Sequence, residues 1–283
     1  MSRVYDALRQ WNRERGLSAD IFKYEGAAQG PTKPEESETQ ELLRWDSIAE
    51  FVAACRPEDH LIALNNGKEL GNEKFRLLQS RLRQMSLLRK INTVLITSAV
   101  PEDGKSLVAA NLAISLATHT NLKVLLLEGD LHKPTLAKKV GLTGRPGLSE
   151  CLSNGGTVEK SCYRLRNNHL WVLPAGRSQE HPLSLLQSAI FQRIFAILSS
   201  AFDWILIDSP PLLPLADAGF WAQQSDGILL VVRNAHTPRE LLKRSLEVID
   251  TSKLIGVVFN DSQPTEHDYY KRYYRSPNPA PEA

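Results

Sequence analysis

The sequence contains few cysteines and no long hydrophobic run. Its three cysteines are Cys55, Cys151 and Cys162, and none of their spacings is typical of a metal site. So small and odd a number fits a reducing compartment better than a disulfide-stabilised fold. The longest apolar runs, such as residues 228–232, have the length of strands, and the N-terminal residues lack the apolar region of a signal peptide. We therefore expect a cytoplasmic chain with no membrane span of its own.

An excess of charge of either sign is also missing. The 283 residues include 34 Lys and Arg against 32 Asp and Glu, which gives a formal net charge of +2. A chain so nearly balanced has no overall field that attracts nucleic acid or anionic lipid. We therefore expect no nucleic-acid partner, and other partners must be recognised at local sites. The length allows one or two domains with a substantial core.

One stretch, NTVLITSAVPEDGKSLVAANLAISLA at residues 92–117, dominates the sequence. Its pattern predicts an apolar strand, a tight loop that ends at residues 103–106, and a helix. The amide groups of such a loop and the positive end of the helix bind phosphate. We expect Lys105 to neutralise the β- and γ-phosphates of a nucleotide and the Ser106 hydroxyl to ligate Mg²⁺. Ala99 replaces the first glycine of the usual pattern G-x-x-x-x-G-K-[ST], so the alternative is a helix start with a chance Gly-Lys-Ser.

Strands alternate with helices from residue 92 onward. Apolar strands joined by helical crossovers predict an α/β fold, a doubly wound and mainly parallel sheet with helices on both faces. The expected strands are residues 93–97, 123–127, 170–173, 204–207, 227–232 and 254–259, and the expected helices are residues 73–88, 105–118, 182–200 and 238–250.

Four polar segments follow strands of this predicted sheet. Ligands of a parallel sheet bind beyond the carboxyl ends of its strands, so we expect these segments to form one site. They are residues 98–106, residues 128–132, residues 208–211 and Asn260.

Three acidic residues of this site come directly after strands: Glu128, Asp130 and Asp208. An apolar strand that ends in Asp beside a phosphate loop commonly holds Mg²⁺. We therefore expect Asp208 to be a metal ligand together with Ser106. We expect Glu128 or Asp130 to contact the metal, or to orient or deprotonate an attacking hydroxyl group. The alternative role for each is to cap the helix that follows.

The N-terminal part of the chain has a different composition. The apolar spacing of residues 1–16 predicts an amphipathic helix, which packs on its own domain or docks on a partner. Residues 26–40 are rich in Gly, Pro and Glu and are predicted to be a flexible linker. A short helix is expected at residues 41–55 and a brief strand or extended arm at residues 60–64.

The C-terminal part is rich in tyrosine and proline. The segment DYYKRYY contributes Tyr269, Tyr270, Tyr273 and Tyr274, four of the seven tyrosines of the chain. Polar sequence with prolines surrounds it and predicts a mobile arm that can reach a neighbouring subunit. The alternative is an aromatic patch that packs on the core. We therefore divide the chain into a helical N-terminal extension at residues 1–59, a P-loop domain at 60–262 and a tail at 263–283.

Six motifs together resemble the bacterial tyrosine kinases of capsule and exopolysaccharide synthesis. This family lies within the deviant-Walker P-loop ATPases, which include the division-site and plasmid-partitioning proteins. The resemblance covers approximately residues 60–275. The motifs are TSAVPEDGKS at residues 97–106, LLEGDLHKPTL at 126–136, GRPGLSECL at 144–152, LPAG at 173–176, FDWILIDSPP at 202–211 and GVVFN at 256–260.

The resemblance implies an ATP-dependent and Mg²⁺-dependent tyrosine autokinase. Its subunits would form a ring in which the tail tyrosines are phosphorylated in trans. A membrane polysaccharide co-polymerase, or chain-length regulator, would activate the kinase through a cytoplasmic tail and hold it at the inner face of the plasma membrane. The residues implied are Lys105, Glu128, Asp130 and Asp208 for catalysis, Pro101, Glu102, Asp103, Gly104, Lys105, Ser106, Leu107 and Asn260 for the nucleotide, Ser106, Asp130 and Asp208 for the metal, and Glu73 and Arg76 for the ring contact.

Four positions depart from the family pattern. Glu102 stands where the family has glycine, Glu128 replaces the first Asp of its motif, His132 replaces arginine, and Gln79 interrupts the ring motif. ATP binding survives such changes more readily than phosphoryl transfer does. Two alternatives therefore stay open: a nucleotide-dependent scaffold of the polysaccharide export machinery with weak or absent kinase activity, and a partitioning-type ATPase.

Overall fold

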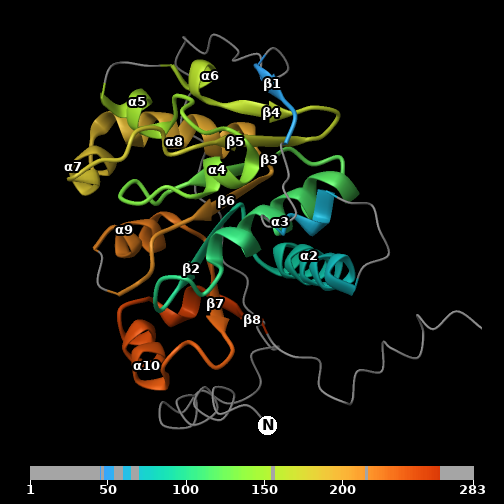
Figure 1. Ribbon diagram of the computed structural model, residues 1–283, viewed down its shortest axis with the longest axis vertical. Coiled ribbons are helices and arrows are strands. Elements are labelled where there is room, and N and C mark those ends of the chain that lie inside the picture. Colours follow the sequence, from blue (N-terminus) through green and yellow to red (C-terminus); the bar gives the residue numbers. More distant parts are fainter. Residues whose placement is uncertain are drawn as a thin grey trace, which may run out of the picture.

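The computed structural model of the chain describes residues 45, 48–53, 60–64, 70–153, 157–213 and 216–261. At the centre of these residues is an eight-stranded sheet in the order β1-β4-β5-β3-β6-β2-β7-β8 (Figure 1). Every neighbouring pair is parallel except β4 and β5. The expected α/β fold with a mainly parallel sheet is therefore confirmed. The strands are β1 (Glu50–Phe51), β2 (Thr93–Ser98), β3 (Val124–Glu128), β4 (Tyr163–Leu165), β5 (Leu170–Leu173), β6 (Trp204–Asp208), β7 (Gly227–Arg233) and β8 (Leu254–Asn260).

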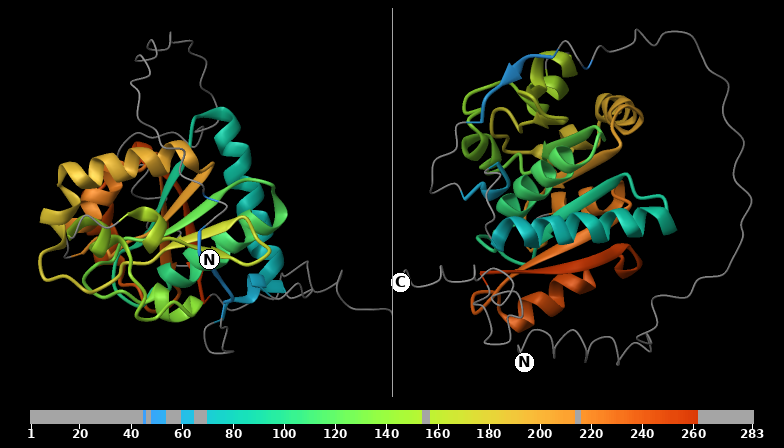
Figure 2. Two further views of the ribbon diagram at one scale, coloured as in Figure 1. Left: turned by 90° about the horizontal axis from the view of Figure 1, so that it is seen from above. Right: turned by 90° about the vertical axis from the view of Figure 1, so that its right-hand side faces the viewer.

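Helices cover both faces of the sheet, as the left view of Figure 2 shows. Successive side chains of a strand point to opposite faces, so each buried strand contributes to two apolar clusters. Leu95 and Ile207 pack with residues of α5, α7, α8, α9 and α10, whereas Ile96 and Leu206 pack with residues of α2, α3 and α4. The helices are α2 (Leu70–Leu88), α3 (Lys105–His119), α4 (Leu136–Val140), α5 (Leu148–Ser153), α6 (Val158–Ser161), α7 (Pro182–Leu186), α8 (Ala189–Ala201), α9 (Ala216–Gln224) and α10 (Arg239–Glu247).

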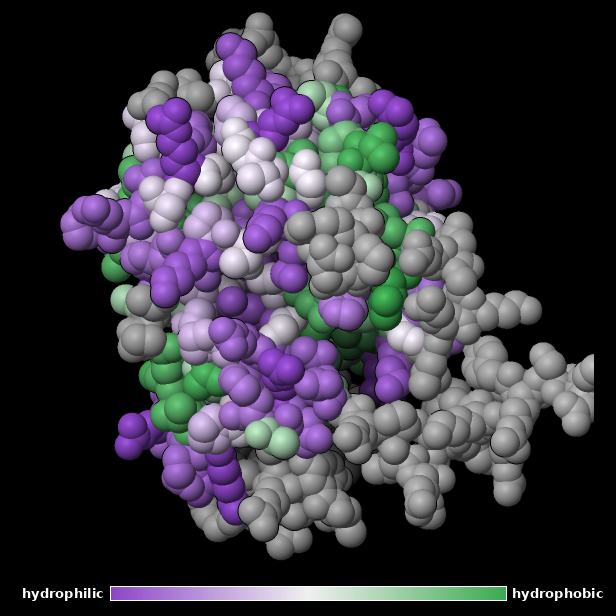
Figure 3. Space-filling model, in the orientation of Figure 1, coloured by the Kyte–Doolittle hydropathy of each residue, from purple (hydrophilic) through white to green (hydrophobic). Residues whose placement is uncertain are grey.

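The outer surface is largely polar on the face drawn in Figure 3, where hydrophilic residues surround smaller hydrophobic areas. Within the described ranges, no helix combines the length and the apolar character needed to cross a membrane.

The edge of the sheet at β1 and β4 was not expected from the sequence. Residues 41–55 do not form one helix, because Glu50 and Phe51 form β1 and pair with β4. Trp45 also belongs to the core, since the centroid of its ring lies 4.7 Å from that of the Phe202 ring. The sheet and its core therefore include residues that precede residue 60, the expected start of the domain.

Two further expectations are wrong in detail. Residues 62–64 form a 3-10 helix, η3 (Ile62–Leu64), instead of part of a strand. The helix expected at residues 182–200 is two helices, α7 and α8. The Ser188 side chain starts the second one by accepting a hydrogen bond from the Phe191 amide at 3.2 Å.

Three expected segments lie outside the described residues. They are the amphipathic helix at residues 1–16, the linker at 26–40 and the tyrosine-rich tail at 263–283.

Candidate active site

The loop between β2 and α3 has the shape that phosphate binding requires. Its last residue, Gly104, is the N-cap of α3 and has a φ of 94°. A Cβ atom at Gly104 would also collide with the side-chain amide of Asn260, so both backbone angle and space require glycine. The first amide groups of a helix have no acceptor within it, and α3 presents them directly after the loop. The positive end of the helix therefore offers free donors for a polyphosphate.

Lys105 and Ser106 begin α3 and lie beside Asp208, the last residue of β6. β2 and β6 are neighbours in the sheet, with Ile96 opposite Asp208. Burial raises the pKa of Asp208 to about 7, while the charge of Lys105 and a hydrogen bond with Ser106 oppose the rise. The fold thus brings together three residues that the sequence predicted for one site.

The residues around Asp208 fit a divalent cation. Its Oδ1 atom is buried and accepts no hydrogen bond from any described residue. A buried carboxylate oxygen without a donor is costly, and a cation would satisfy it. In the part of the chain that the structure describes, no group of three or more His, Cys, Asp or Glu side chains could hold a metal alone. That fits Mg²⁺, which commonly takes one or two protein carboxylates and completes its shell with water and substrate phosphates.

Glu128, at the end of β3, has both carboxylate oxygens engaged by backbone amides. Its side chain is completely buried. One carboxylate oxygen accepts from the Leu136 amide at 2.5 Å, and the other accepts from the Ala175 amide at 3.0 Å. Burial raises the pKa of Glu128, and these backbone hydrogen bonds oppose the rise. Glu128 therefore ties the start of α4 and the chain after β5 to the end of β3.

Asp130 lies two residues beyond β3 and retains a free oxygen. Its Oδ1 atom accepts from the Lys133 amide at 3.0 Å, while Oδ2 receives no hydrogen bond from the residues described. The charges of Glu128 and Asp130 both contribute to the raised pKa of Asp208, so the three carboxylates lie in the same region. Asp130 is better placed than Glu128 to accept a proton from a substrate.

His132, which departs from the family pattern, has a partner of its own. Its Nε2 atom lies 2.9 Å from Oδ2 of Asp217, near the start of α9. Burial raises the pKa of Asp217, and His132 opposes the rise. This contact links the segment after β3 to α9 and accounts for the imidazole without a metal.

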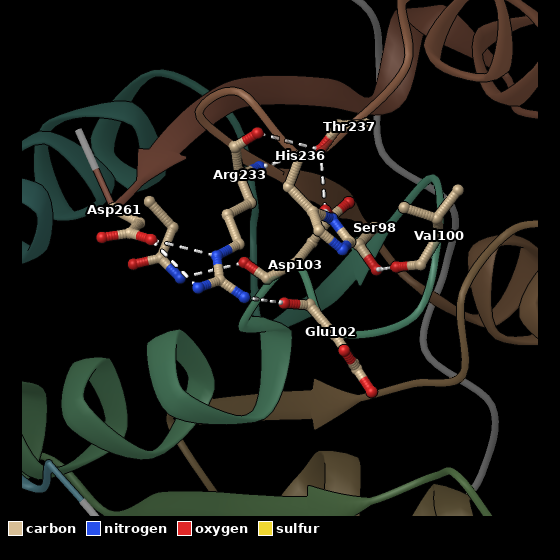
Figure 4. A network of polar contacts seen from close by, with 9 residues as sticks. Ser98, Val100, Glu102, Asp103, Arg233, His236, Thr237 and Asp261 are labelled. Carbon is tan, nitrogen blue, oxygen red and sulfur yellow. Dashed lines mark hydrogen bonds and ion pairs between the residues drawn. The ribbon is translucent and has the colours of Figure 1, made fainter.

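The phosphate loop is also held by residues at the ends of β7 and β8 and in the turn after β7 (Figure 4). The Asp103 carboxylate is completely buried and accepts from the Thr237 hydroxyl at 2.7 Å. His236 Nδ1 lies 3.3 Å from the same Asp103 oxygen. Asn260 donates its side-chain amide to the Asp103 carbonyl at 2.9 Å, and Arg233, the last residue of β7, reaches the neighbouring carbonyl of Glu102. Sequence reasoning singled out Asn260 but missed the three residues from β7. The rule that flagged the other strand ends would have found them, since they follow the strand expected at 227–232.

The remaining residues predicted to contact the nucleotide lie in the loop and at the start of α3, and those predicted for the ring contact lie on α2. Pro101 and Glu102 are exposed in the loop, and Leu107 is half-buried in the first turn of α3. Glu73 and Arg76 lie on α2, where Arg76 Nη1 contacts Glu73 Oε1 at 2.8 Å. These two residues form an exposed pair away from the strand ends, and the four tail tyrosines lie outside the described residues.

Comparison with known proteins gives several long matches in sequence. No protein-family model matches the chain. It is 33% identical over 220 residues to the tyrosine-protein kinase YwqD of Bacillus subtilis, which covers 77% of this chain and 92% of YwqD. It is 31% identical over 205 residues to the putative tyrosine-protein kinase CapB of Staphylococcus aureus, with 72% of this chain and 90% of CapB covered.

Solved structures give matches of similar extent. The chimerical protein CapA2B2 is 28% identical, with a TM-score of 0.69 over 77% of this chain and 96% of that chain. The kinase domain of VpsO is 30% identical, with a TM-score of 0.58 over 69% of this chain and the whole of that domain.

Proposed function

This chain belongs to the bacterial tyrosine kinases of capsule and exopolysaccharide synthesis, and from this premise we propose how its site transfers the γ-phosphate of ATP to tyrosine. The observation that carries the proposal is the meeting of Lys105, Ser106 and Asp208 at the ends of two neighbouring strands. A buried carboxylate oxygen without a donor, next to a phosphate-binding helix end, suits a nucleotide and its metal ion.

The loop and the start of α3 bind the nucleotide. The free amide groups and the Lys105 ammonium would hold the β- and γ-phosphates, and Pro101 to Leu107 with Asn260 would form the nucleotide contact. Ser106, Asp130 and Asp208 would hold Mg²⁺, directly or through water, and the ion would neutralise charge on the phosphates. Phosphoryl transfer needs mainly such positioning and neutralisation.

Asp130 would receive the proton of the acceptor. As the tyrosine oxygen bonds to the γ-phosphorus, the bond from that phosphorus to the bridging oxygen of ADP breaks, and the phenolic proton passes to the carboxylate of Asp130. Its Oδ2 atom is the one without a hydrogen bond from the described residues. Glu128 is a positioning residue in this scheme, because both of its oxygens already accept backbone amides.

The acceptors proposed are Tyr269, Tyr270, Tyr273 and Tyr274, phosphorylated in trans within a ring to which Glu73 and Arg76 contribute. The proposed partner is a membrane polysaccharide co-polymerase, which would activate the kinase and recruit it to the inner face of the plasma membrane. The succinoglycan biosynthesis transport protein ExoP of Rhizobium meliloti supports this context: it is 32% identical over 71% of this chain, which spans 26% of ExoP. We propose that the kinase domain includes Trp45, since that residue is part of the core.

One experiment tests the proposal. The purified chain is incubated with Mg-ATP, with and without a cytoplasmic tail peptide of the co-polymerase, and its phosphotyrosines are mapped by mass spectrometry. We expect labelling within residues 269–274 and none in the Lys105→Ala variant. ATP binding without any phosphotyrosine would favour the nucleotide-dependent scaffold. ATP hydrolysis without phosphotyrosine would favour the partitioning-type ATPase.

A further inference from the structure

The phosphate loop contains a backbone conformation that its sequence does not favour. Glu102 has a φ of 64° and Gly104, two residues on, has a φ of 94°. Glycine adopts such angles freely, but a glutamate there is strained. Glu102 is exposed, so its own side chain is not packed in a way that would hold this angle. Other residues must therefore stabilise this part of the loop.

Contacts from the turn after β7 supply that stabilisation (Figure 4). Arg233 Nη1 reaches the Glu102 carbonyl at 3.4 Å, and its Nε and Nη2 atoms both contact Asp261 Oδ2, at 3.1 and 3.0 Å. The Thr237 hydroxyl donates to the buried Asp103 carboxylate at 2.7 Å, and His236 approaches the same oxygen. Two successive loop residues, Glu102 and Asp103, are thus held by residues 233–237, which are the end of β7 and the turn after it.

These contacts differ in strength. Thr237 is 8% exposed and Asp103 is fully buried, so their hydrogen bond is shielded from water. Hydrogen bonds to a buried charged group are among the stronger ones in proteins. Arg233 and His236 have side chains 38% and 41% exposed, and exposed pairs contribute little. The Thr237 hydroxyl should therefore matter most.

We propose that Arg233, His236 and Thr237, hereafter the loop clamp, are positioning residues that keep the phosphate loop in its nucleotide-binding shape. The clamp touches the loop through the Glu102 carbonyl and the Asp103 side chain, which leaves the amides at the start of α3 free for phosphate. Its bracing partner Asp261 directly follows β8, so the clamp also joins the loop to the end of the last strand. The inference rests on the proposed function in that it takes ATP as the ligand.

The first test compares two substitutions of Thr237. Thr237→Val removes the hydroxyl and keeps the shape, whereas Thr237→Ser keeps the hydroxyl. We expect the ATP dissociation constant, measured by calorimetry, to rise about fivefold in Thr237→Val and to stay within about twofold in Thr237→Ser. Thermal unfolding without nucleotide is measured in parallel. A Thr237→Val variant that unfolds at a lower temperature but binds ATP as tightly as the unaltered chain would overturn the proposal, because the hydroxyl would then be structural only.

The second test remains decisive if Thr237→Val does not fold. Arg233→Met should weaken ATP binding about threefold, and the matched control Arg166→Met should not. Arg166 forms a comparable exposed ion pair with Glu50 at 3.6 Å, at the opposite edge of the sheet. Because Glu102→Gly removes the strain, Arg233→Met should lose most of its effect in that background. Equal losses in both backgrounds, or in both arginine variants, would overturn the role of Arg233.

The two proposals fail in different ways. An unaltered chain that binds ATP but labels no tyrosine would overturn the kinase mechanism, and the clamp would still be tested by the dissociation constants. An unaltered chain that does not bind ATP would overturn both. The third outcome is a chain that binds ATP and labels its tail, but whose ATP dissociation constant does not change in Thr237→Val or Arg233→Met. That outcome would overturn the clamp alone.

Discussion

Two buried acidic residues, Glu128 and Asp208, end neighbouring strands and lie directly opposite each other in the sheet. Both follow an apolar strand, and burial raises the pKa of both. Their partners differ. Both Glu128 oxygens accept backbone amides, whereas Asp208 Oδ1 accepts no hydrogen bond from the residues described.

In the proposed mechanism, this difference separates a structural carboxylate from a functional one. The hydrogen bonds that offset the burial of Glu128 come from the chain itself, so its place needs no ligand. Burial of Asp208 is offset only in part, by Lys105 and Ser106, and a bound cation would complete its surroundings. The same sequence pattern thus carries two roles, and the backbone around each strand end decides between them.

The largest effect is expected from Asp208→Asn. Loss of the carboxylate removes a proposed metal ligand, and we expect the rate of tyrosine phosphorylation to fall at least about a thousandfold. The measurement is initial-rate labelling of the tail with Mg-ATP, with circular dichroism to verify the fold. A variant that keeps a tenth or more of the rate would contradict the assigned role.

A somewhat smaller loss is expected from Asp130→Asn. Removing the proton acceptor should slow phosphoryl transfer about a hundredfold while ATP binding stays within about threefold. Single-turnover labelling at saturating ATP separates the two quantities. If Glu128→Gln slowed single-turnover transfer more than Asp130→Asn did, the proposed roles of the two residues would be reversed.

Glu128→Gln should act mainly on stability. Its amide group would face one of the two backbone N–H groups and leave it without an acceptor, so we expect the free energy of unfolding to fall by about 2–3 kcal/mol. The folded fraction should keep most of its transfer rate. Urea unfolding and labelling on the same preparation test this. Unchanged stability would show that the hydrogen bonds to Leu136 and Ala175 contribute nothing.

A smaller effect concerns the pH dependence of stability. Asp208 should make the folded chain less stable as the pH rises. Its folded pKa of about 7 lies above the usual value of 3.8, so from about pH 4 to 7 the folded chain keeps a proton that the unfolded chain releases. Stability due to this group therefore falls as the pH rises through that window. Asp208→Asn lacks this titration and should gain about 1–2 kcal/mol over the unaltered chain between pH 6 and pH 8, without nucleotide.

The check is urea unfolding of both chains at the two pH values. Glu128 and Asp217 also have raised pKa values, but they are present in both chains and cancel in the difference. A constant difference between the two chains would mean that Asp208 does not titrate in this range.

The sequence predicted the central strands of the sheet better than its edge. The six expected strands are apolar runs bounded by polar residues, five of them buried and β8 half-buried, and each lies within one residue of its expected ends. β1 and β4 have only two and three residues, and they form because they pair with each other and with β5. Such short strands have no periodicity of their own, so their formation depends on tertiary contacts that local patterns do not contain.

The sequence predicted which strand ends meet, but it did not separate the proposed roles of the residues there. Lys105, Ser106 and Asp208 follow strands in a pattern tied to one chemistry, and the fold brings them together. The division of labour between Glu128 and Asp130 depends on which oxygens meet backbone amides. Those amides belong to residues as distant in sequence as Ala175. Contacts of this range follow only from the folded structure.

The most direct measurement is Mn²⁺ binding in place of Mg²⁺, followed by electron paramagnetic resonance with a non-hydrolysable ATP analogue. If Asp208 is the ligand and Glu128 the structural partner, Asp208→Asn should weaken Mn²⁺ binding at least about tenfold, while folded Glu128→Gln should stay within about threefold of the unaltered chain. Equal losses in the two variants, or none in Asp208→Asn, would contradict the account.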